Sequence, residues 1–343
     1  MKAIGYQYNK DKKTATFVEF GQQKPEPKDH DLLVKIEAVS VNPVDYKVRQ
    51  KIEHSENPPR ILGWDAAGVV ESIGEKVSLF EKGDRVFYAG DITLSGSNAS
   101  HQLVDEHIVG NMPKTLDFPA AAALPLTSIT AWEALFDRLK IDSTVNRYKQ
   151  ILIIGGAGGV GSIAIQLAKK VAHLRVIATA SREESRKWCL SLGADYVINH
   201  HDNMIEQFQQ QALAIPDYIL CLNSTDDHFK TMSELIAPQG MICSIVETTQ
   251  SHNLDELKTK SAGFIWEFMF TRSMYKTADR IKQHELLNSI SELIDSGKIK
   301  TTLKEVFGLM SAENIMKAHK QLEAGSSIGK IVLTQIDSSG KFV

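Results

Sequence analysis

The spacing of apolar and polar residues changes part-way along the chain and predicts two kinds of region. Up to about residue 110, short apolar segments are separated by turn residues such as Gly83 and Asp84, as in a β-rich region. From Gln150 onward, apolar strand-like segments alternate with stretches of helical periodicity, which predicts a parallel, doubly wound sheet. The expected strands lie at 32–39, 68–73, 85–88, 151–154, 175–180, 194–198, 217–222 and 240–246.

Helical patterns lie on both sides of the second region. The segment 117–125 carries Pro119 near a first helical turn, and 128–139 has an apolar face that includes Trp132 and Phe136. Further helices are expected at 286–294 and 312–322, and a closing strand at 330–334.

The segment 151–162 combines an unbroken apolar strand with a glycine turn. Ile151–Ile154 shows no alternation, as expected of a parallel strand that is buried on both faces. Gly156, Gly158 and Gly161 follow in the G-x-G-x-x-G spacing, and helical periodicity begins inside the motif. Such a turn lets a pyrophosphate meet the free N–H groups at the positive end of a helix.

The context of this turn favours a dinucleotide site over a glycine-rich structural turn. A second strand at 175–181 arrives at the distance that a βαβ unit requires. The glycine turn therefore predicts cofactor contacts by residues 156 and 158–161, namely Gly156, Gly158, Gly159, Val160 and Gly161.

The end of the second strand indicates which dinucleotide binds. NAD sites usually place an acidic residue here for the ribose 2′-hydroxyl, whereas this chain has Ser181 and Arg182, with Arg186 one helical turn later. A hydroxyl and guanidinium groups suit a 2′-phosphate, so we expect NADPH in preference to NADH. The alternative is a solvated helix start, which Glu183 and Glu184 also favour.

Composition sets broad limits on the partners of the chain. Its 343 residues are enough for two domains, 43% are hydrophobic, and the net charge of −3 gives no reason to expect nucleic acid or an anionic membrane. No apolar run approaches the ~18 residues of a membrane span. Cys189, Cys221 and Cys243 are odd in number and widely spaced, which indicates reduced core thiols and a cytoplasmic location.

The order of these segments resembles the medium-chain dehydrogenase/reductase superfamily, in particular its quinone oxidoreductase branch and the bacterial zinc-type alcohol dehydrogenase-like proteins. The motifs that carry the resemblance are Val41-Asn-Pro-Val-Asp45, Gly63-Trp-Asp-Ala-Ala-Gly-Val-Val70, Gly83-Asp-Arg-Val86, the alanine-rich segment 120–131, Ala157-Gly-Gly-Val-Gly161 and Gly329-Lys-Ile-Val-Leu333.

The resemblance implies an α/β protein built from two domains. A GroES-like β-barrel catalytic domain would comprise residues 1–125 and 272–343, with a Rossmann NADP-binding domain at 126–271 and the active cleft between them. A homodimer is also expected, because family members commonly pair strands between subunits.

Zinc ligands of the family are missing at the matching positions. The first ligand, a Cys, corresponds to Asn42, and the second, a His, corresponds to Trp64, and neither side chain is a plausible replacement. The segment 89–100, where a structural zinc lobe is expected, contains no cysteine. His101 and the His200–His201 pair are other possible ligands, but surface or loop histidines explain them better. We therefore expect no zinc.

Without zinc, reduction of a quinone or an enone is favoured over oxidation of an alcohol, because these acceptors take up hydride directly. The candidate catalytic residues are Asn42, as a hydrogen-bond donor to substrate or nicotinamide, and Tyr46 and Lys47, as proton donors. Solubility explains the polar turn at Tyr46 and Lys47 equally well.

Further cofactor contacts follow from the resemblance and from strand positions. They are expected at the ends of strands and at the closing segment, namely at His200, Asn223, Ile245, Val246, Gly329 and Lys330. Trp64, Phe264 and Trp266 are candidates for an aromatic substrate pocket, although a sixth strand with a core or dimer face explains residues 264–270 better.

Three hypotheses of function remain at this point. The favoured one is an NADPH-dependent quinone or enone reductase. The second is an alcohol dehydrogenase or an enoyl-thioester reductase, but Glu53 stands where thioester reductases have a catalytic Tyr. The third is an NADPH-binding protein without turnover.

Overall fold

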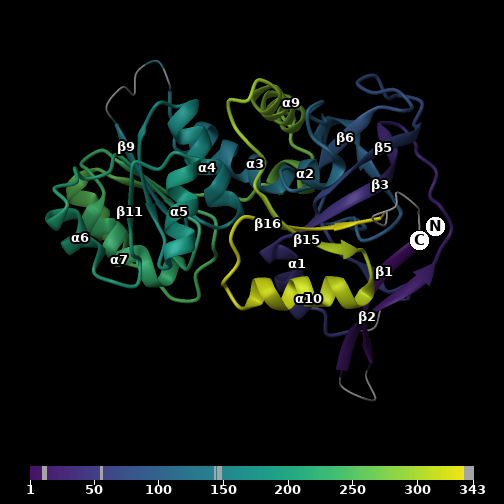
Figure 1. Cartoon of the computed structure of the whole chain (residues 1–343), viewed down its shortest axis with the longest axis horizontal. Helices are drawn as coiled ribbons and strands as arrows, with labels where there is room; N and C mark the ends of the chain where they lie inside the picture. The colour runs from purple at the N-terminus through teal and green to yellow at the C-terminus, as the bar shows by residue number, and fades with distance from the viewer. Residues whose placement is uncertain (10–13, 55–56, 143, 145–148, 336–343) are drawn as a thin grey trace. The chain divides into compact units, whose positions relative to one another are not determined.

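The computed structural model divides the chain into two compact units, each described here by itself (Figure 1). It describes every residue except 10–13, 55–56, 143, 145–148 and 336–343. Unit 1 comprises Met1–Leu126 and Phe270–Val343, and unit 2 comprises Thr127–Met269. The domain boundaries expected from the sequence lie after residues 125 and 271, and the unit boundaries of the structure lie after residues 126 and 269.

Unit 2 is built on a parallel six-stranded sheet with the order β11-β10-β9-β12-β13-β14. This order is that of a Rossmann fold, so the predicted doubly wound sheet is confirmed. The strands are β9 (Gln150–Ile154), β10 (Arg175–Thr179), β11 (Tyr196–Ile198), β12 (Tyr218–Cys221), β13 (Met241–Ser244) and β14 (Gly263–Trp266). The helices that follow them are α4 (Gly159–Lys170), α5 (Glu183–Leu192), α6 (Met204–Gln210), α7 (Thr225–Leu235) and the 3-10 helix η3 (Leu254–Lys260).

The central strand β9 is completely enclosed. Ile151–Ile154 are 0% exposed, because β10 and β12 flank the strand and helices cover it. Leu152 and Ile154 share a core cluster with residues of β12 and α7, including Ile219 and Met232. Full burial of each such side chain contributes about 1.5–3 kcal/mol, so the unbroken apolar run is what fixes this strand at the centre.

The turn after β9 needs its glycines for two different reasons. Gly155 has a φ of +86°, a conformation that residues with a Cβ avoid. Gly161 has an ordinary φ, but a Cβ there would lie 2.4 Å from the carbonyl oxygen of Gly155. At Gly156 a Cβ would lie 2.8 Å from the Cβ of Ala178, whereas at Gly158 the nearest atom would be 3.6 Å away. The chain therefore folds tightly at Gly156 and Gly161, whereas Gly158 has room for a further atom.

Unit 1 is a β-rich body around the long strand β3 (Asp31–Val41), which pairs with β5, β7 and β16. The sheet runs in the order β15-β16-β3-β5-β6-β8, and a second sheet has the order β2-β1-β4. The other strands are β1 (Lys2–Asn9), β2 (Thr14–Gly21), β4 (Arg60–Ile61), β5 (Ala66–Ile73), β6 (Arg85–Tyr88), β7 (His101–Asp105), β8 (Val109–Asn111), β15 (Leu303–Leu309) and β16 (Lys330–Thr334).

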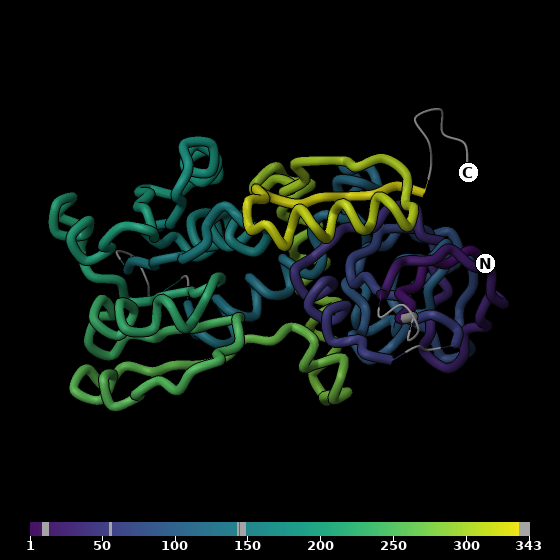
Figure 2. Tube along the Cα trace, turned by 90° about the horizontal axis from the view of Figure 1, so that it is seen from below, coloured from purple at the N-terminus to yellow at the C-terminus, as the bar shows by residue number. Residues whose placement is uncertain are grey.

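Three helices of unit 1 were expected. These are α9 (Lys282–Asp295), α10 (Ala312–Glu323) and, within the expected segment 117–125, the shorter α2 (Phe118–Ala122). Figures 1 and 2 show α10 alongside β15 and β16. Strand β16, late in the chain, pairs with β3, which lies early in the chain. The other short helices are α1 (Pro43–Gln50), the 3-10 helix η1 (Glu106–Ile108) and α8 (Thr271–Met274).

The structure differs from the sequence-based expectation at two helices. Residues 43–50 form the eight-residue helix α1, where only one polar turn was expected. The predicted helix 128–139 consists of α3 (Pro125–Trp132) followed by a π-helix at Glu133–Arg138. The wider turn suits Arg138, whose guanidinium lies 3.7 Å from Glu133 and 2.7 Å from the buried Glu267.

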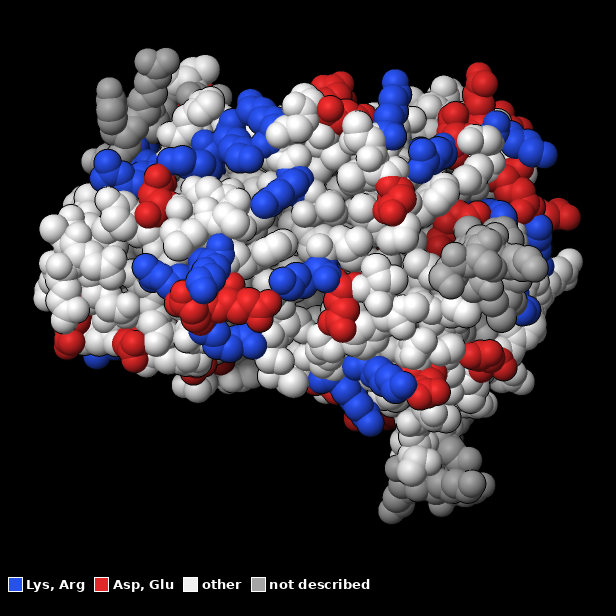
Figure 3. Space-filling model, in the orientation of Figure 1, with Lys and Arg blue, Asp and Glu red and all other residues white. Residues whose placement is uncertain are grey.

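Surface and core agree with the composition. Basic and acidic side chains are interspersed on the face drawn in Figure 3. The three cysteines are buried and unpaired, as predicted. Among the residues that the structure describes, no helix is both apolar enough and long enough for a membrane span.

Candidate functional site

Helix α4 of unit 2 begins directly at the glycine turn. Its N-cap, Gly158, offers no side chain to its first N–H groups, and the first turn contains no acidic residue. The turn is tied to β10, because the N–H of Gly155 donates to Thr179 Oγ1 at 3.0 Å. An uncapped, positive helix end beside a glycine with free space suits a phosphate group.

The residues predicted to select NADPH lie at the C-terminal end of β10. Ser181 and Arg182 are exposed, and Arg182 is the N-cap of α5. Arg186 is anchored, because its Nη1 donates to the carbonyl oxygen of Val197 at 2.5 Å. Glu183 and Glu184 lie in the first turn of α5, so both readings of this segment, a 2′-phosphate site and a solvated helix start, fit the geometry.

His200 and Asn223 line a cavity of about 510 Å³, together with residues of α6 and α7. The ring of His200 lies 4.4 Å from that of His201 and 6.2 Å from that of His228, and its Nδ1 is buried with no hydrogen-bond partner in the part of the chain that the structure describes. Burial, with His201 and His228 nearby, lowers the pKa of His200 to about 4. The imidazole is therefore a flat, uncharged ring at neutral pH.

The ends of β12 and β13 are joined by Thr225, the first residue of α7. Its hydroxyl group donates to the carbonyl oxygen of Val246 at 2.6 Å and lies 2.6 Å from Ser244 Oγ. These bonds fix Ile245 and Val246 beyond β13, on the same sheet edge as Asn223. The predicted cofactor residues of unit 2 thus lie along the carboxyl edge of its sheet.

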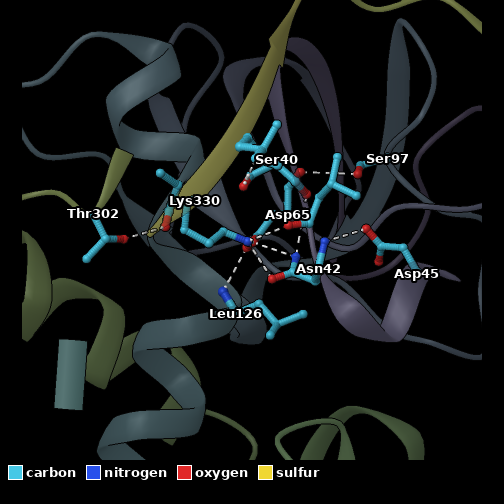
Figure 4. A network of polar contacts seen from close by, with 11 residues as sticks. Ser40, Asn42, Asp45, Asp65, Ser97, Leu126, Thr302 and Lys330 are labelled. Carbon is cyan, nitrogen blue, oxygen red and sulfur yellow. Dashed lines mark hydrogen bonds and ion pairs between the residues drawn. The ribbon is translucent and has the colours of Figure 1, made fainter. Parts of the chain in front are cut away.

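Unit 1 contains a buried ion pair at the residues that the sequence motifs single out (Figure 4). Lys330, on β16, is 3% exposed, and its Nζ lies 3.0 Å from Asp65 Oδ2. The same ammonium group donates to the carbonyl oxygen of Val41 at 2.9 Å and to Asn42 Oδ1. All three N–H donors of Lys330 therefore have acceptors inside the protein.

Asn42 is the centre of this network. Its Nδ2 donates to Asp65 Oδ2 at 2.8 Å, and its Oδ1 accepts from Lys330. Its backbone N–H donates to Asp45 Oδ2 at 2.8 Å, which fixes the start of α1. The amide group of Asn42 is thus held in one orientation by a cation on one side and an anion on the other.

Asp65 is held as a carboxylate by its donors. Oδ1 accepts the N–H of Leu126 at 2.7 Å, and Oδ2 accepts from Asn42 and Lys330. Burial raises the pKa of Asp65, while Lys330, Asn42 and the Leu126 N–H oppose that shift. None of these groups offers a lone pair to a proton on Asp65, so the hydrogen bonds fit its ionised form.

Other predicted residues of unit 1 lie close by in the sequence. Tyr46 and Lys47 are half-buried on α1 and both have partners. Gly329, which precedes Lys330, is buried with a φ of +60°, so a side chain there would strain the backbone. The roles of Tyr46 and Lys47 as proton donors, and of Gly329 as a cofactor contact, remain predictions.

The aromatic candidates for the substrate pocket occupy different surroundings. Trp64 is 1% exposed in the core of unit 1, packs edge-on against Phe270, and donates its indole N–H to the carbonyl oxygen of Asp91. Phe264 and Trp266 stack on each other on β14, the edge strand of the sheet in unit 2. The structure does not bring these three rings into one unit.

The residues do not fit a catalytic zinc site. Trp64 Nε1 is a donor that is already bound, Asn42 is engaged by two charged partners, and the three cysteines lie in unit 2. Both ring nitrogens of His101 are held, by Ser100 and Glu71. Within the described residues, only His30, Glu106 and His107 cluster closely enough for a metal. There the Glu106 carboxylate already accepts from His30 and from two backbone N–H groups.

Asp65 and Asp45 are site residues that sequence reasoning missed. For Asp65 a signal was available, because it is the single acidic residue inside the apolar segment 63–70. A buried charge needs a partner, so this residue indicated an ion pair. The partner itself could not be found, since Lys330 lies 265 residues further along the chain.

Replacing Lys330 by Met should destabilise unit 1 by about 3–5 kcal/mol, because the Asp65 carboxylate would remain buried without its counter-ion. The double variant K330M/D65N should recover part of this loss, since it removes the stranded charge. K317M, which removes an exposed lysine of α10, should cost less than about 0.5 kcal/mol. Denaturant unfolding measures all three free energies, and a K330M loss no larger than that of K317M would contradict the ion pair's role.

Two family models match the chain. A model described as alcohol dehydrogenase GroES-like domain matches residues 28–122, and one described as zinc-binding dehydrogenase matches residues 192–333. Together with the sheet order of unit 2, they confirm the predicted fold class, a GroES-like domain combined with a Rossmann domain.

Relatives cover nearly the whole chain. A zinc-type alcohol dehydrogenase-like protein of Staphylococcus aureus (strain MSSA476) is 47% identical over 336 residues, which cover 97% of this chain and 99% of the relative. Human quinone oxidoreductase is 31% identical over 314 residues, 90% of each chain. The solved Escherichia coli quinone oxidoreductase complexed with NADPH has a TM-score of 0.80 at 24% identity, covers 97% of this chain and 100% of its own, and shares the fold. By this similarity the chain belongs to the medium-chain dehydrogenase/reductase superfamily of oxidoreductases.

Proposed function

We propose that the chain is an NADPH-dependent reductase that transfers hydride to quinones or α,β-unsaturated carbonyl compounds without zinc. The observation that carries the proposal is the chemistry of the residues at the positions where zinc-dependent family members have their metal ligands. Positions 42 and 64 hold an amide and an indole, and the neighbouring cation is the protein's own Lys330. The name of the human relative, quinone oxidoreductase, supports the substrate class.

The residues of unit 2 fit a nicotinamide dinucleotide. A pyrophosphate would lie at the start of α4, against Gly156, Gly158, Gly159, Val160 and Gly161. Gly158 leaves space there for a further atom, whereas Gly156 and Gly161 do not. Ser181, Arg182 and Arg186 would hold a 2′-phosphate. The neutral ring of His200 and Asn223 would contact the adenosine part, and Ile245 and Val246 would lie further along the same sheet edge.

The reaction requires little covalent chemistry from the protein. Bound NADPH would supply the hydride, and a quinone or an enone accepts it without a Lewis acid because the resulting anion is delocalised. Asn42 would orient the reacting end of the site, since the two ions beside it fix its amide. Gly329 and Lys330 would contact the cofactor. Tyr46 or Lys47 would donate the proton that the product anion needs.

The remaining parts of the proposal concern the substrate pocket and assembly. Trp64, Phe264 and Trp266 are the residues proposed to line an aromatic substrate pocket. The partner is a small molecule, and the protein would be a cytoplasmic homodimer. Strand β14 is an edge strand, and Trp266 is 46% exposed on it, which leaves both a dimer face and a pocket open.

Three alternatives remain. A zinc-type alcohol dehydrogenase is favoured by the relatives' names, but not by residues 42 and 64. An enoyl-thioester reductase would lack its tyrosine, because position 53 is Glu. An NADPH-binding protein without turnover would need the same residues in unit 2, so binding alone does not distinguish it.

Cofactor choice is tested by replacing Arg182 with Gln. The affinity for NADPH should fall roughly tenfold or more, because a charge-assisted hydrogen bond to the 2′-phosphate is lost, while the affinity for NADH should stay the same. Calorimetric titration measures both. The matched control is R175Q, which removes an exposed arginine at the opposite end of β10. Equal binding of NADH and NADPH by the unaltered protein would refute the preference.

Activity is tested with a panel of quinones, enones and primary alcohols, followed by the absorbance of NADPH. We expect NADPH oxidation with quinones or enones and no reduction of NADP⁺ by primary alcohols. Loss of a proton donor in Y46F or K47A should lower turnover by roughly 10²–10⁴-fold, whereas Y275F, at an exposed tyrosine, should not. Unchanged turnover in both Y46F and K47A would remove these candidates, and no oxidation with any acceptor would favour the non-catalytic alternative.

A further inference from the structure

Asp45 is a buried acid that the proposed mechanism does not use. It is the third residue of α1 and is 1% exposed. Its Oδ2 accepts the backbone N–H of Asn42, and its own N–H donates to the carbonyl oxygen of Asn42 at 3.0 Å. Its Oδ1 is buried and has no hydrogen-bond partner among the described residues. One of its two carboxyl oxygens is thus left unsatisfied, which is costly for an ionised group.

The buried network contains two acids but one cation. Lys330 uses its three donors on Val41, Asn42 and Asp65, and none of them reaches Asp45. The charged groups that act on Asp45 are Lys330 of β16 and Asp65, just before β5. Arg49, on the same helix, is directed to Glu323 and Met316 of α10. Two carboxylates would therefore leave one negative charge without compensation in the interior.

We propose that Asp45 carries the proton that keeps this network neutral, and that loss of this proton makes Asp45 a pH-sensitive positioning residue for Asn42. With the proton in place, Asp65 and Lys330 neutralise each other, and Asp45 is an uncharged acceptor for the Asn42 N–H. Without it, a second negative charge lies at the backbone N–H of Asn42, the residue whose side-chain amide the ion pair orients.

The electrostatics of Asp45 agree with this division of roles. Burial raises the pKa of Asp45 to about 7, with a further increase from Asp65, while the Asn42 N–H and Lys330 act in the opposite direction. The two acids differ because Asp65 receives three donors and Asp45 receives one. The more weakly solvated acid is the one that keeps its proton.

The consequence for turnover rests on the proposed function, in which Asn42 lies at the reacting end of the site. Transfer of hydride places negative charge on the quinone or enone before a proton from solvent or a side chain completes the reduction. A neutral network tolerates this charge, whereas an ionised Asp45 opposes it and strengthens its pull on the Asn42 N–H. Turnover should therefore decrease above about pH 7.

The proton itself is tested without any substrate, by the pH dependence of stability. Asp45 has a higher pKa in the folded chain than in the unfolded chain, so the native state holds more protons between the two values. Its stabilising contribution is therefore present at low pH and is lost as pH rises towards the folded pKa. Relative to D45N, a permanently neutral isostere, the denaturant midpoint of the wild type should fall between about pH 4 and about pH 7.

D117N is the matched control for this comparison. Asp117 also caps a helix of unit 1, through a bond to the Ala120 N–H, and Asn is an equally good N-cap. D117N should keep the pH dependence of the wild type. Parallel curves for the wild type and D45N from about pH 4 to about pH 7 would overturn the proposal.

Two further measurements keep the proposal falsifiable if D45N does not fold or has no activity. In wild-type protein labelled with ¹³C-aspartate, one carboxyl signal should titrate with a midpoint near 7, and titration of every aspartate below about pH 5 would overturn the proposal. Where NADPH-dependent turnover is measurable, D45N should lose the decline above about pH 7, and an identical decline in D45N would refute the link to turnover. Absence of any turnover would contradict the proposed function alone, because the stability and NMR measurements do not depend on turnover.

Discussion

The ion pair between Lys330 and Asp65 is the constraint on which unit 1 depends. It lies in an interior where a charge without a partner would be strongly destabilising, and it joins the closing strand β16 to the segment before β5. Asn42 lies between the two ions and passes the constraint on to the start of α1. The beginning and the end of the chain therefore have to fold together for this site to exist, which explains why unit 1 is assembled from both chain ends.

The same ion pair supports the proposal that the chain works without zinc, although its relatives are named zinc-type. The relatives' names refer to zinc, but Asn42 and Trp64 already have hydrogen-bond partners of their own, and the cation beside Asn42 is an ammonium group that cannot act as a Lewis acid. What such a site can provide is a fixed amide and a balanced charge. Those properties suit acceptors that take up hydride directly, which is the basis of the proposed function.

Sequence patterns were sufficient where the physics is local. Ile151–Ile154 predicted a strand buried on both faces, because apolar residues without alternation have no solvent-facing side, and the structure confirms it. The glycine spacing predicted a tight turn before a helix, but it did not show that Gly155, outside the motif positions, adopts the left-handed conformation. Helix α1 was missed because its polar residues resemble a solvated turn. Asp65 and Lys330 were not paired in advance, because each charge is visible in its own segment, but only the fold shows that they meet.

The central claim is that hydride transfer here proceeds beside a protein-borne cation, without a metal. The most direct test is to dialyse the purified protein against a chelator, to determine its zinc content by elemental analysis, and to measure NADPH oxidation with a quinone before and after dialysis. The account predicts far less than one zinc ion per chain and unchanged turnover after dialysis. One tightly held zinc ion per chain, whose removal abolishes turnover and whose return restores it, would contradict the account.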